Sequence, residues 1–209
     1  MKSVIVMMTV ICLLLVSVRA MAVEEPAYKV LNTFDDFEVR QYSPYVVAET
    51  LAKGSYENAG DSAFSLLAGY IFGENQGGKS IAMTAPVAQM PVRLDERQPV
   101  TQIRQSAAQS GDDAEFIVQF AMPADMTLQT LPKPNDNRVV LRQLPERRLA
   151  VIRYSGNWSE EKYLKQLQKL KSALEKQGLN WQGEPIWARY NSPWMPSFMR
   201  RNEIFLQIQ

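Results

Sequence analysis

The stretch Phe37–Leu51, FEVRQYSPYVVAETL, contains two strand-like runs, Phe37–Tyr42 and Tyr45–Leu51, separated by Ser43-Pro44. Both runs are rich in aromatic and β-branched residues, and a Ser-Pro pair between them favours a turn, so the stretch predicts a β-hairpin. From Asn58 to Phe72 the apolar residues take up the spacing of a helix. The hairpin and this helix therefore form the beginning of a β–β–α unit.

A second copy of the pattern lies 102 residues further on, where Leu141-Arg142-Gln143 matches Val39-Arg40-Gln41. A second helix is predicted after it from Ser159 to Gln177, with Ser159 as N-cap and Gly178 as a stop. Chance similarity between two hairpins is the alternative, but several matches at one offset favour an internal duplication. The further matched pairs are Ala48 and Ala150, Gly54 and Gly156, and Tyr56 and Trp158.

The remaining predicted elements complete two strand–strand–helix–strand–strand units. We expect an α+β fold in which these duplicated units, approximately residues 28–122 and 137–209, form a distorted antiparallel β-barrel or paired sheets with two helices. A cleft is expected where the halves meet. The other predicted features are strands at Ile81–Met90, Glu115–Met122, Pro185–Tyr190 and Glu203–Gln209, an exposed loop at Gln98–Ala114, and a buried stripe of Leu164, Leu167, Leu170 and Leu174 on the second helix.

The first 22 residues, MKSVIVMMTVICLLLVSVRAMA, predict a secretory signal peptide. Lys2 precedes an apolar run from Val4 to Val18, and the small-residue site Ala20-Met21-Ala22 predicts cleavage after Ala22. The run is shorter than the roughly 20 residues that span a bilayer, so a retained anchor is the less favoured alternative. We expect one mature domain, residues 23–209, located in the periplasm or secreted and with no stable membrane insertion.

Composition excludes several kinds of chemistry. The chain contains no histidine, and its one cysteine, Cys12, lies in the predicted signal peptide. Nucleophile–imidazole pairs and zinc sites built on histidine or cysteine are therefore excluded. Removing Lys2 and Arg19 from the 23 basic residues leaves 21 against 22 acidic ones, so the mature chain is nearly neutral. Such a balance gives no electrostatic reason to expect nucleic-acid binding.

The segment Gly73–Ser80, GENQGGKS, fits the letters of a phosphate-binding P-loop, G-x-x-x-x-G-K-[ST]. A P-loop connects a strand to a following helix, whereas this segment follows a predicted helix and precedes a predicted strand. Pro86 would also break a helix that began at Lys79. We therefore expect no nucleotide site here.

Acidic residues form no obvious catalytic pair. Asp35-Asp36, Asp112-Asp113 and Glu160-Glu161 are sequence neighbours, and neighbours do not face one another on a strand or helix. Large apolar side chains, by contrast, are abundant in the second half of the chain and around Met83, and methionine and aromatic linings suit flat hydrophobic ligands. The balance favours a binding protein over an enzyme.

Two motifs resemble signatures of the SOUL haem-binding protein family. Lys79–Val87, KSIAMTAPV, is similar to the family's I-A-M-T-x-P-V strand, and Tyr190–Ile204, YNSPWMPSFMRRNEI, is similar to its tyrosine–proline loop ending in R-R-N-E-I. The resemblance covers about residues 26–209. It implies a duplicated barrel-like fold, related to the effector-binding domains of bacterial regulators, with affinity for haem or other tetrapyrroles.

The resemblance also implies a site and structural contacts. The cofactor-binding residues it suggests come from the first helix and the strand after it; they are Phe64, Leu67, Tyr70, Met83, Thr84 and Met90. Arg201, Asn202 and Glu203 are expected to tie the last strand to the body through buried hydrogen bonds. Histidine ligation is impossible, so an axial iron ligand is unknown, with Met83, Met90 and Tyr70 as candidates.

We therefore expect an exported monomer that carries, buffers or scavenges a tetrapyrrole, holding the porphyrin by apolar contact. Three alternatives stay open at this point. The first is a carrier of another flat or lipid-like molecule. The second is a hydrolase that uses a buried carboxylate such as Glu49 with Tyr56 or Tyr154. The third is an interaction protein whose Pro193–Pro196 loop docks a partner.

Overall fold

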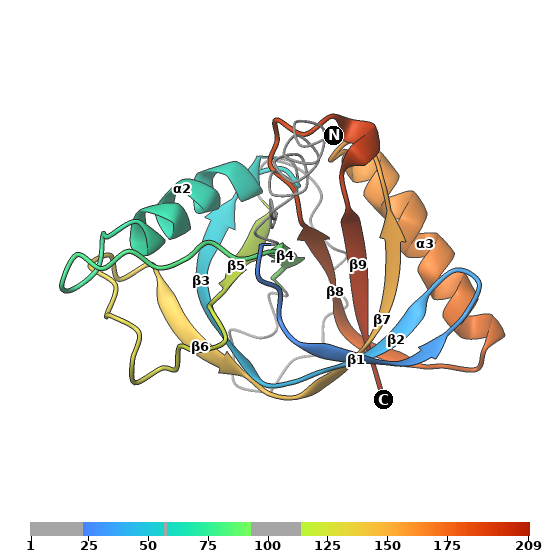
Figure 1. Cartoon of the computed structure of the whole chain (residues 1–209). Coiled ribbons are helices and arrows are strands. Elements are labelled where there is room, and N and C mark those ends of the chain that lie inside the picture. Colours follow the sequence, from blue (N-terminus) through green and yellow to red (C-terminus); the bar gives the residue numbers. More distant parts are fainter. Residues whose placement is uncertain (1–22, 57, 93–113) are drawn as a thin grey trace, which may run out of the picture.

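The computed structural model describes residues 23–56, 58–92 and 114–209, which form one curled nine-stranded antiparallel sheet with two α-helices on it (Figure 1). The predicted signal peptide and nearly all of the predicted loop at Gln98–Ala114 lie outside the described residues. The elements are β1 (Tyr28–Thr33), β2 (Glu38–Tyr42), β3 (Tyr45–Lys53), α2 (Ala59–Ile71), β4 (Val87–Pro91), β5 (Glu115–Ala121), β6 (Val140–Leu144), β7 (Arg147–Tyr154), α3 (Glu160–Lys176), β8 (Trp181–Arg189), the 3-10 helix η2 (Ser197–Met199) and β9 (Asn202–Ile208).

The sheet confirms the duplicated fold. After β1, which the sequence did not predict, the order β–β–α–β–β occurs twice, and the strands lie in the order β1-β2-β7-β9-β8-β4-β5-β3-β6. The first strand of each unit pairs with the second strand of the other unit: β2 pairs with β7, and β6 pairs with β3. Val39 lies opposite Ala150, and Leu141 lies opposite Ala48, so the offset of 102 residues is preserved in the strand register. The two units meet at β4 and β8 in the middle of the sheet.

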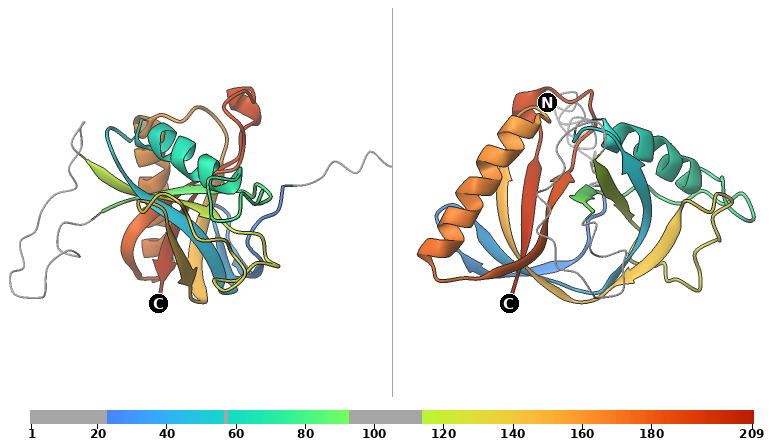
Figure 2. Two further views of the ribbon diagram at one scale, coloured as in Figure 1. Left: turned by 90° about the vertical axis from the view of Figure 1, so that its left-hand side faces the viewer. Right: turned by 180° about the vertical axis from the view of Figure 1, so that it is seen from behind.

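The two helices cover the outer face of the curled sheet, one on each unit (Figure 1). Seen from behind, α2 and α3 lie on opposite flanks (Figure 2). The main hydrophobic core lies between these helices and the sheet. A smaller cluster lies on the opposite, inner face, because strand side chains alternate between faces: Ala150 and Ile152 belong to the main core, and Leu149 and Val151 to the inner cluster.

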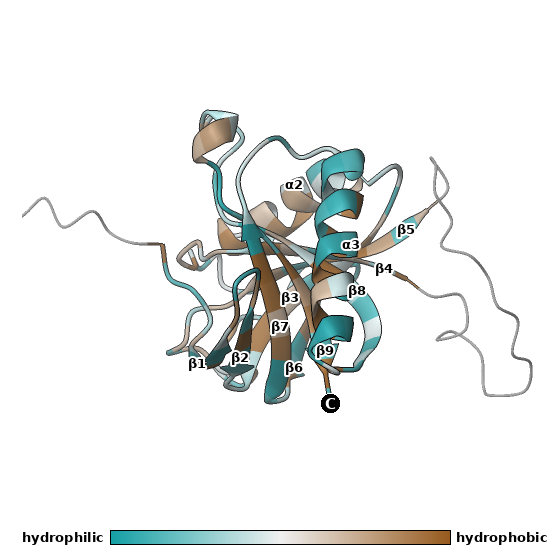
Figure 3. Ribbon diagram, turned by 90° about the vertical axis from the view of Figure 1, so that its right-hand side faces the viewer, coloured by the Kyte–Doolittle hydropathy of each residue, from teal (hydrophilic) through white to brown (hydrophobic). Residues whose placement is uncertain are grey.

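The buried face of α3 differs from the prediction by one residue. Ser159 caps the helix as predicted, its hydroxyl accepting the backbone N–H of Lys162. Leu164, however, is 50% exposed, and Tyr163 is buried in its place. Tyr163 starts the regular spacing that Leu167, Leu170 and Leu174 continue, and its ring packs against other core aromatics. Figure 3 shows the outer side of α3 as largely hydrophilic.

The predicted strand at Ile81–Met90 is also wrong in its first half. The observed strand β4 begins at Val87, and residues 81–86 have an irregular course, although Ile81 and Ala85 are buried. The backbone N–H of Ile81 donates to Ile71 O, at the end of α2, which turns it away from the sheet. Pro86 has no N–H to offer a sheet ladder. The apolar residues that this irregular segment buries therefore gave its sequence the composition of a strand.

The GENQGGKS segment is a connector between α2 and this irregular segment, as predicted. The side chain of Asn75 organises it: its Nδ2 donates to Tyr70 O and to Lys79 O, and its Oδ1 accepts the N–H of Lys79. These bonds fold the segment onto itself. It does not connect a strand to a helix N-terminus, so it lacks the geometry of a phosphate-binding loop.

Candidate ligand-binding site

The inner face of the curled sheet forms a groove between the two units. Its wall is mainly aromatic and aliphatic, with one arginine and one glutamine: Pro26, Tyr42, Tyr45, Val47, Pro86, Ala88, Gln119, Ala121, Arg147, Ile186, Tyr190 and Phe205. A neighbouring cavity of about 200 Å³ opens beside it at the end of β5. Ligand pockets commonly measure roughly 300–1,000 Å³, so this cavity alone does not enclose a porphyrin.

Residues 23–27 form a strap across this groove. Glu24 O accepts the N–H of Ala85 at 2.8 Å, and Glu24 Oε1 accepts the N–H of Ala124 at 2.7 Å. On the other unit, Arg201 Nη1 donates to Glu25 Oε1 at 2.7 Å. The strap therefore bridges the two halves of the molecule, and Pro26 lines both hollows beneath it.

We predict that the double substitution Glu24→Ala, Glu25→Ala loosens the strap without unfolding the protein. Each glutamate makes a charge-assisted contact near the surface, so together they contribute on the order of 1–2 kcal/mol to closure. The amide of Ala124, which Glu24 holds, should exchange with solvent roughly tenfold faster. Hydrogen exchange measures this, and Glu38→Ala serves as a matched surface control. Unchanged exchange at Ala124 would contradict a strap held by these side chains.

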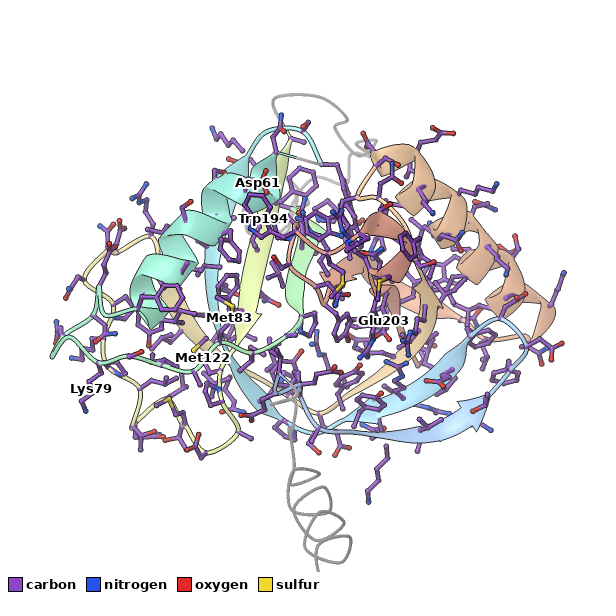
Figure 4. All side chains as sticks on the ribbon, turned by 45° about the horizontal axis from the view of Figure 1, so that its top comes forward. Asp61, Lys79, Met83, Met122, Trp194 and Glu203 are labelled. Carbon is purple, nitrogen blue, oxygen red and sulfur yellow. The ribbon has the colours of Figure 1, made fainter. Side chains whose placement is uncertain are left out.

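A buried ionic network lies at the far side of the groove, around Glu203 (Figure 4). Glu203 is fully buried and accepts hydrogen bonds from Arg40, Tyr190 and Arg201. The pKa of Tyr190 is raised, first because burial disfavours its charged form and then because the Glu203 carboxylate lies beside it. The neighbouring residue Asn202 accepts a hydrogen bond from the indole N–H of Trp158 and donates one to Gly156 O. The predicted structural role of Arg201, Asn202 and Glu203 is thus confirmed.

The three predicted site residues on α2 differ in accessibility. Phe64 is 39% exposed and touches Phe120 of β5 with its ring. Leu67 is fully buried, and Tyr70 is nearly so, with its hydroxyl donating to Pro132 O at 2.9 Å. Of the three, Phe64 alone exposes a large part of its side chain at the molecular surface, whereas Leu67 and Tyr70 support the helix from inside.

The three predicted residues after α2 are also separated from one another. Met83 is 44% exposed and lies beside α2 (Figure 4). Thr84 is half-buried, and its hydroxyl donates to Ala121 O. Met90 packs against the cluster on the inner face, while Leu67 belongs to the core on the outer face. The six residues therefore form no single cavity, and Phe64 and Met83 are the two that remain exposed.

The loop between β8 and β9 adds exposed apolar side chains. In the sequence, only the motif Tyr190–Ile204 drew attention to this loop. Trp194 is 93% exposed, Phe198 is 75% exposed and Met199 is 60% exposed. Arg200 holds the loop in shape by donating to Met195 O and Pro193 O. Figure 4 labels Trp194, and part of the loop tip is coloured as hydrophobic in Figure 3. Where such side chains form a contiguous patch, the patch is typical of surfaces that contact ligands or partners.

The carboxylate site considered for a hydrolase is not assembled. Glu49 points to the inner face, where it accepts hydrogen bonds from Arg142 and Gln119. Tyr56 and Tyr154 belong to the core on the outer face. A sheet therefore separates the carboxylate from both hydroxyls. In the described parts of the chain there is also no group of three or more acidic, histidine or cysteine residues that could hold a metal ion.

The helices that the structure describes include none with the length and apolar character needed to cross a membrane.

The duplicated β–β–α–β–β sheet with two outer helices is a fold that solved structures of other proteins share. Solved structures with this fold include the C-terminal domain of EcmrR, with a TM-score of 0.59 at 10% identity over 87% of this chain and 98% of that one. A hydrolase from Listeria innocua has a TM-score of 0.55 at 11% identity over 86% and 94% of the two chains. At such identities these structures show the fold alone.

The SOUL heme-binding protein family model matches residues 23–207, and the chain belongs to this family. Similar proteins include heme-binding protein 2 of Mus musculus, 24% identical over 191 residues that cover 88% of this chain and 86% of the relative. Heme-binding protein 2 of Homo sapiens is 25% identical over 193 residues, covering 90% of this chain and 87% of the relative. The resemblance seen in the two motifs is confirmed.

Proposed function

We propose that the protein binds haem or another tetrapyrrole and acts as an exported carrier, buffer or scavenger rather than as an enzyme. Membership of a haem-binding family supports the ligand class. The observation that carries the binding mode is the complete absence of histidine from the sequence, together with exposed Phe64 and Met83 on and beside α2. These side chains suit the apolar face of a porphyrin. The resident ring is therefore held by apolar contact, without histidine ligation of its iron.

The candidate axial ligands differ in what they can reach. Tyr70 is nearly fully buried and its hydroxyl is bonded to Pro132 O, so it is not free to coordinate iron at the surface. Met90 packs in the inner cluster. Met83 alone of the three is exposed, and a thioether is a weak, soft ligand. If iron is coordinated at all on this surface, Met83 is the residue that does it.

A titration of residues 23–209 with haem and, in parallel, with metal-free protoporphyrin tests the proposal. We expect saturable one-to-one binding of both with similar affinity. Phe64→Ala should weaken both by roughly tenfold, because it removes a ring that the ligand would bury, whereas Leu164→Ala, an exposed apolar residue on the other helix, should change neither. Met83→Leu should also change neither.

Two results would overturn parts of the proposal. Non-saturating shifts with both porphyrins would remove the tetrapyrrole function, and a screen for other flat or lipid-like ligands would follow. Binding of haem alone, abolished by Met83→Leu, would replace apolar contact by iron ligation. Export is tested separately: fractionation of cells that produce the full chain should recover a protein beginning at Val23 outside the cytoplasm, and a full-length cytoplasmic protein would contradict it.

A further inference from the structure

A group of buried polar atoms without hydrogen-bond partners lies in the main core, beneath both helices. Six buried side-chain nitrogen or oxygen atoms of the described residues lack a hydrogen-bond partner, and Arg147 Nε in the groove is one of them. The other five come from neighbouring side chains. They are Tyr56 Oη, Tyr154 Oη, Tyr163 Oη, Trp187 Nε1 and Arg189 Nε. Buried polar groups are rarely left unpaired, so five in one place need a physical explanation.

The five side chains are in mutual contact. The ring centroid of Tyr56 lies 4.4 Å from that of Tyr163 and 5.0 Å from that of Trp187. The guanidinium carbon of Arg189 lies 4.6 Å from the centre of the Trp187 ring. Tyr154 lies close enough to Trp187 and Arg189 to interact with both, and Tyr56 and Tyr163 form a second close pair of this kind. The unpaired atoms thus belong to one polar centre, enclosed by the core.

The centre holds more donors than acceptors. It has five donors, the N–H groups of Trp187 and Arg189 and three tyrosine hydroxyls, and the phenol oxygens offer about three acceptors. Small rotations could pair some hydroxyls with one another. The two N–H groups can only donate, so the centre favours an added acceptor.

Arg189 also brings a positive charge into this centre. It is 7% exposed, and no described acidic group forms an ion pair with it. Its Nη2 donates to the neutral amide of Gln89, whose own Nε2 donates to Tyr56 O. Burial lowers the pKa of Arg189, and the charge of Asp61 on α2 opposes this. A buried cation that has no ion-pair partner among the described residues favours a nearby anion.

The start of α2 adds to the positive potential. A Cβ on Gly60 would collide with the guanidinium of Arg189, so the arginine packs directly against the first turn of the helix. Asn58, the N-cap residue, makes no capping bond with its side chain. The helix N-terminus carries a partial positive charge of about half an electron. The guanidinium, the helix end, the indole N–H and the hydroxyls therefore all favour a negatively charged ligand.

We propose that this centre binds one small inorganic anion of the halide class, chloride under ordinary conditions, held by Arg189 Nε, Trp187 Nε1 and the surrounding tyrosine hydroxyls. A single ion supplies both an acceptor for these donors and a negative charge close to Arg189. A water molecule would satisfy some of the donors but would bring no negative charge. The site lies between sheet and helices, apart from the surface of Phe64 and Met83, and does not depend on tetrapyrrole binding.

The first test is crystallographic. Crystals of residues 23–209 grown or soaked in sodium bromide should give an anomalous bromine peak within hydrogen-bond distance of Arg189 Nε and Trp187 Nε1. A peak of water density at this position without anomalous signal would overturn the proposal, as would a core in which the tyrosines pair with one another and leave no site.

The second test measures stability in solution at constant ionic strength. Replacing sodium gluconate by sodium chloride should raise the midpoint of thermal unfolding, because a ligand bound only to the folded state stabilises it in proportion to the logarithm of its concentration. In Tyr163→Phe, which removes one donor and keeps the ring, the shift should shrink by at least half. Tyr70→Phe is the matched control, since the Tyr70 hydroxyl already has Pro132 O as its partner, and its shift should equal that of the wild type. Equal midpoints in both salts for the wild type would contradict the proposal.

Discussion

Replacing Glu203 by alanine is expected to lower the free energy of unfolding by roughly 3–5 kcal/mol, the cost typical of removing one partner from a buried ion pair. Arg40 donates to both carboxylate oxygens, at 2.9 and 3.3 Å, and Arg201 and Tyr190 donate to them at 3.0 and 2.8 Å. Arg40 is 4% exposed, so the substitution leaves its charge buried without a close partner other than Glu38. Two-state urea unfolding measures the difference.

Glu38→Ala is the matched control for this substitution. Glu38 accepts a hydrogen bond from the same arginine, at 2.7 Å, but its side chain is 35% exposed. Water compensates for its loss, so we expect a cost of about 1 kcal/mol or less. Equal costs for Glu203→Ala and Glu38→Ala would show that the buried network does not stabilise the fold as argued. The double substitution Glu203→Met, Arg40→Met should recover part of the loss, because it removes both buried charges.

The Glu203 network also explains why residues distant in the sequence are held together. Arg40 comes from β2, the strand that the first unit lends to the second, and Glu203 comes from β9. Arg201 extends the network to Glu25 of the strap. One carboxylate thus connects the exchanged strand, the last strand and the segment that covers the groove. Local sequence preferences cannot reveal such a connection, although the R-R-N-E-I motif indicated a structural role for Arg201, Asn202 and Glu203.

The fold was predictable because its signals are local and repeated. Alternating apolar residues around Val39 and Ala48, the glycines at Gly54 and Gly156, and the cap at Ser159 each act within a few residues. Positive φ angles at both glycines, 137° and 129°, show that the repeated turn needs glycine at the same point of each unit. The exchange of β2 and β6 was not predictable, because strand pairing depends on contacts across the whole chain.

The candidate site was predictable only in part. The motif that contains Met83 identified the segment as part of the site but did not predict its irregular backbone. Apolar residues buried in an irregular segment have the composition of a strand. Spacing on α2 gave the correct helix, yet exposure separates Phe64 from Leu67, and only packing against the sheet determines this. The strap and the polar centre around Arg189 left no signal in the sequence, since each joins residues from several elements.

Alkaline solution is expected to unfold the protein before its tyrosines can ionise in place. Burial raises the pKa of seven tyrosines, Tyr70 to about 12, because desolvation penalises the phenolate; the others are Tyr42, Tyr45, Tyr56, Tyr154, Tyr163 and Tyr190. In the unfolded chain the same groups ionise near pH 10. A pKa raised on folding means that the stabilising contribution is complete below about pH 10 and is lost as the pH rises through the folded value.

Tyr70 gives the pH range of the effect. Its stabilising contribution is complete below about pH 10 and is lost as the pH rises to about 12. The seven tyrosines lose their stabilising contributions as the pH rises above about 10, and the net stability of a domain is small, so cooperative unfolding is expected in alkaline solution. Tyrosinate absorbance and far-ultraviolet circular dichroism, followed together as the pH is raised, should change in one step. Gradual ionisation of all tyrosines with the dichroism unchanged would contradict the prediction.

Tyr70→Phe separates the two contributions of this residue. Near neutral pH the substitution should cost about 1 kcal/mol, because the hydrogen bond to Pro132 O is lost. In alkaline solution it should move the unfolding midpoint to higher pH, because one fewer buried hydroxyl must ionise.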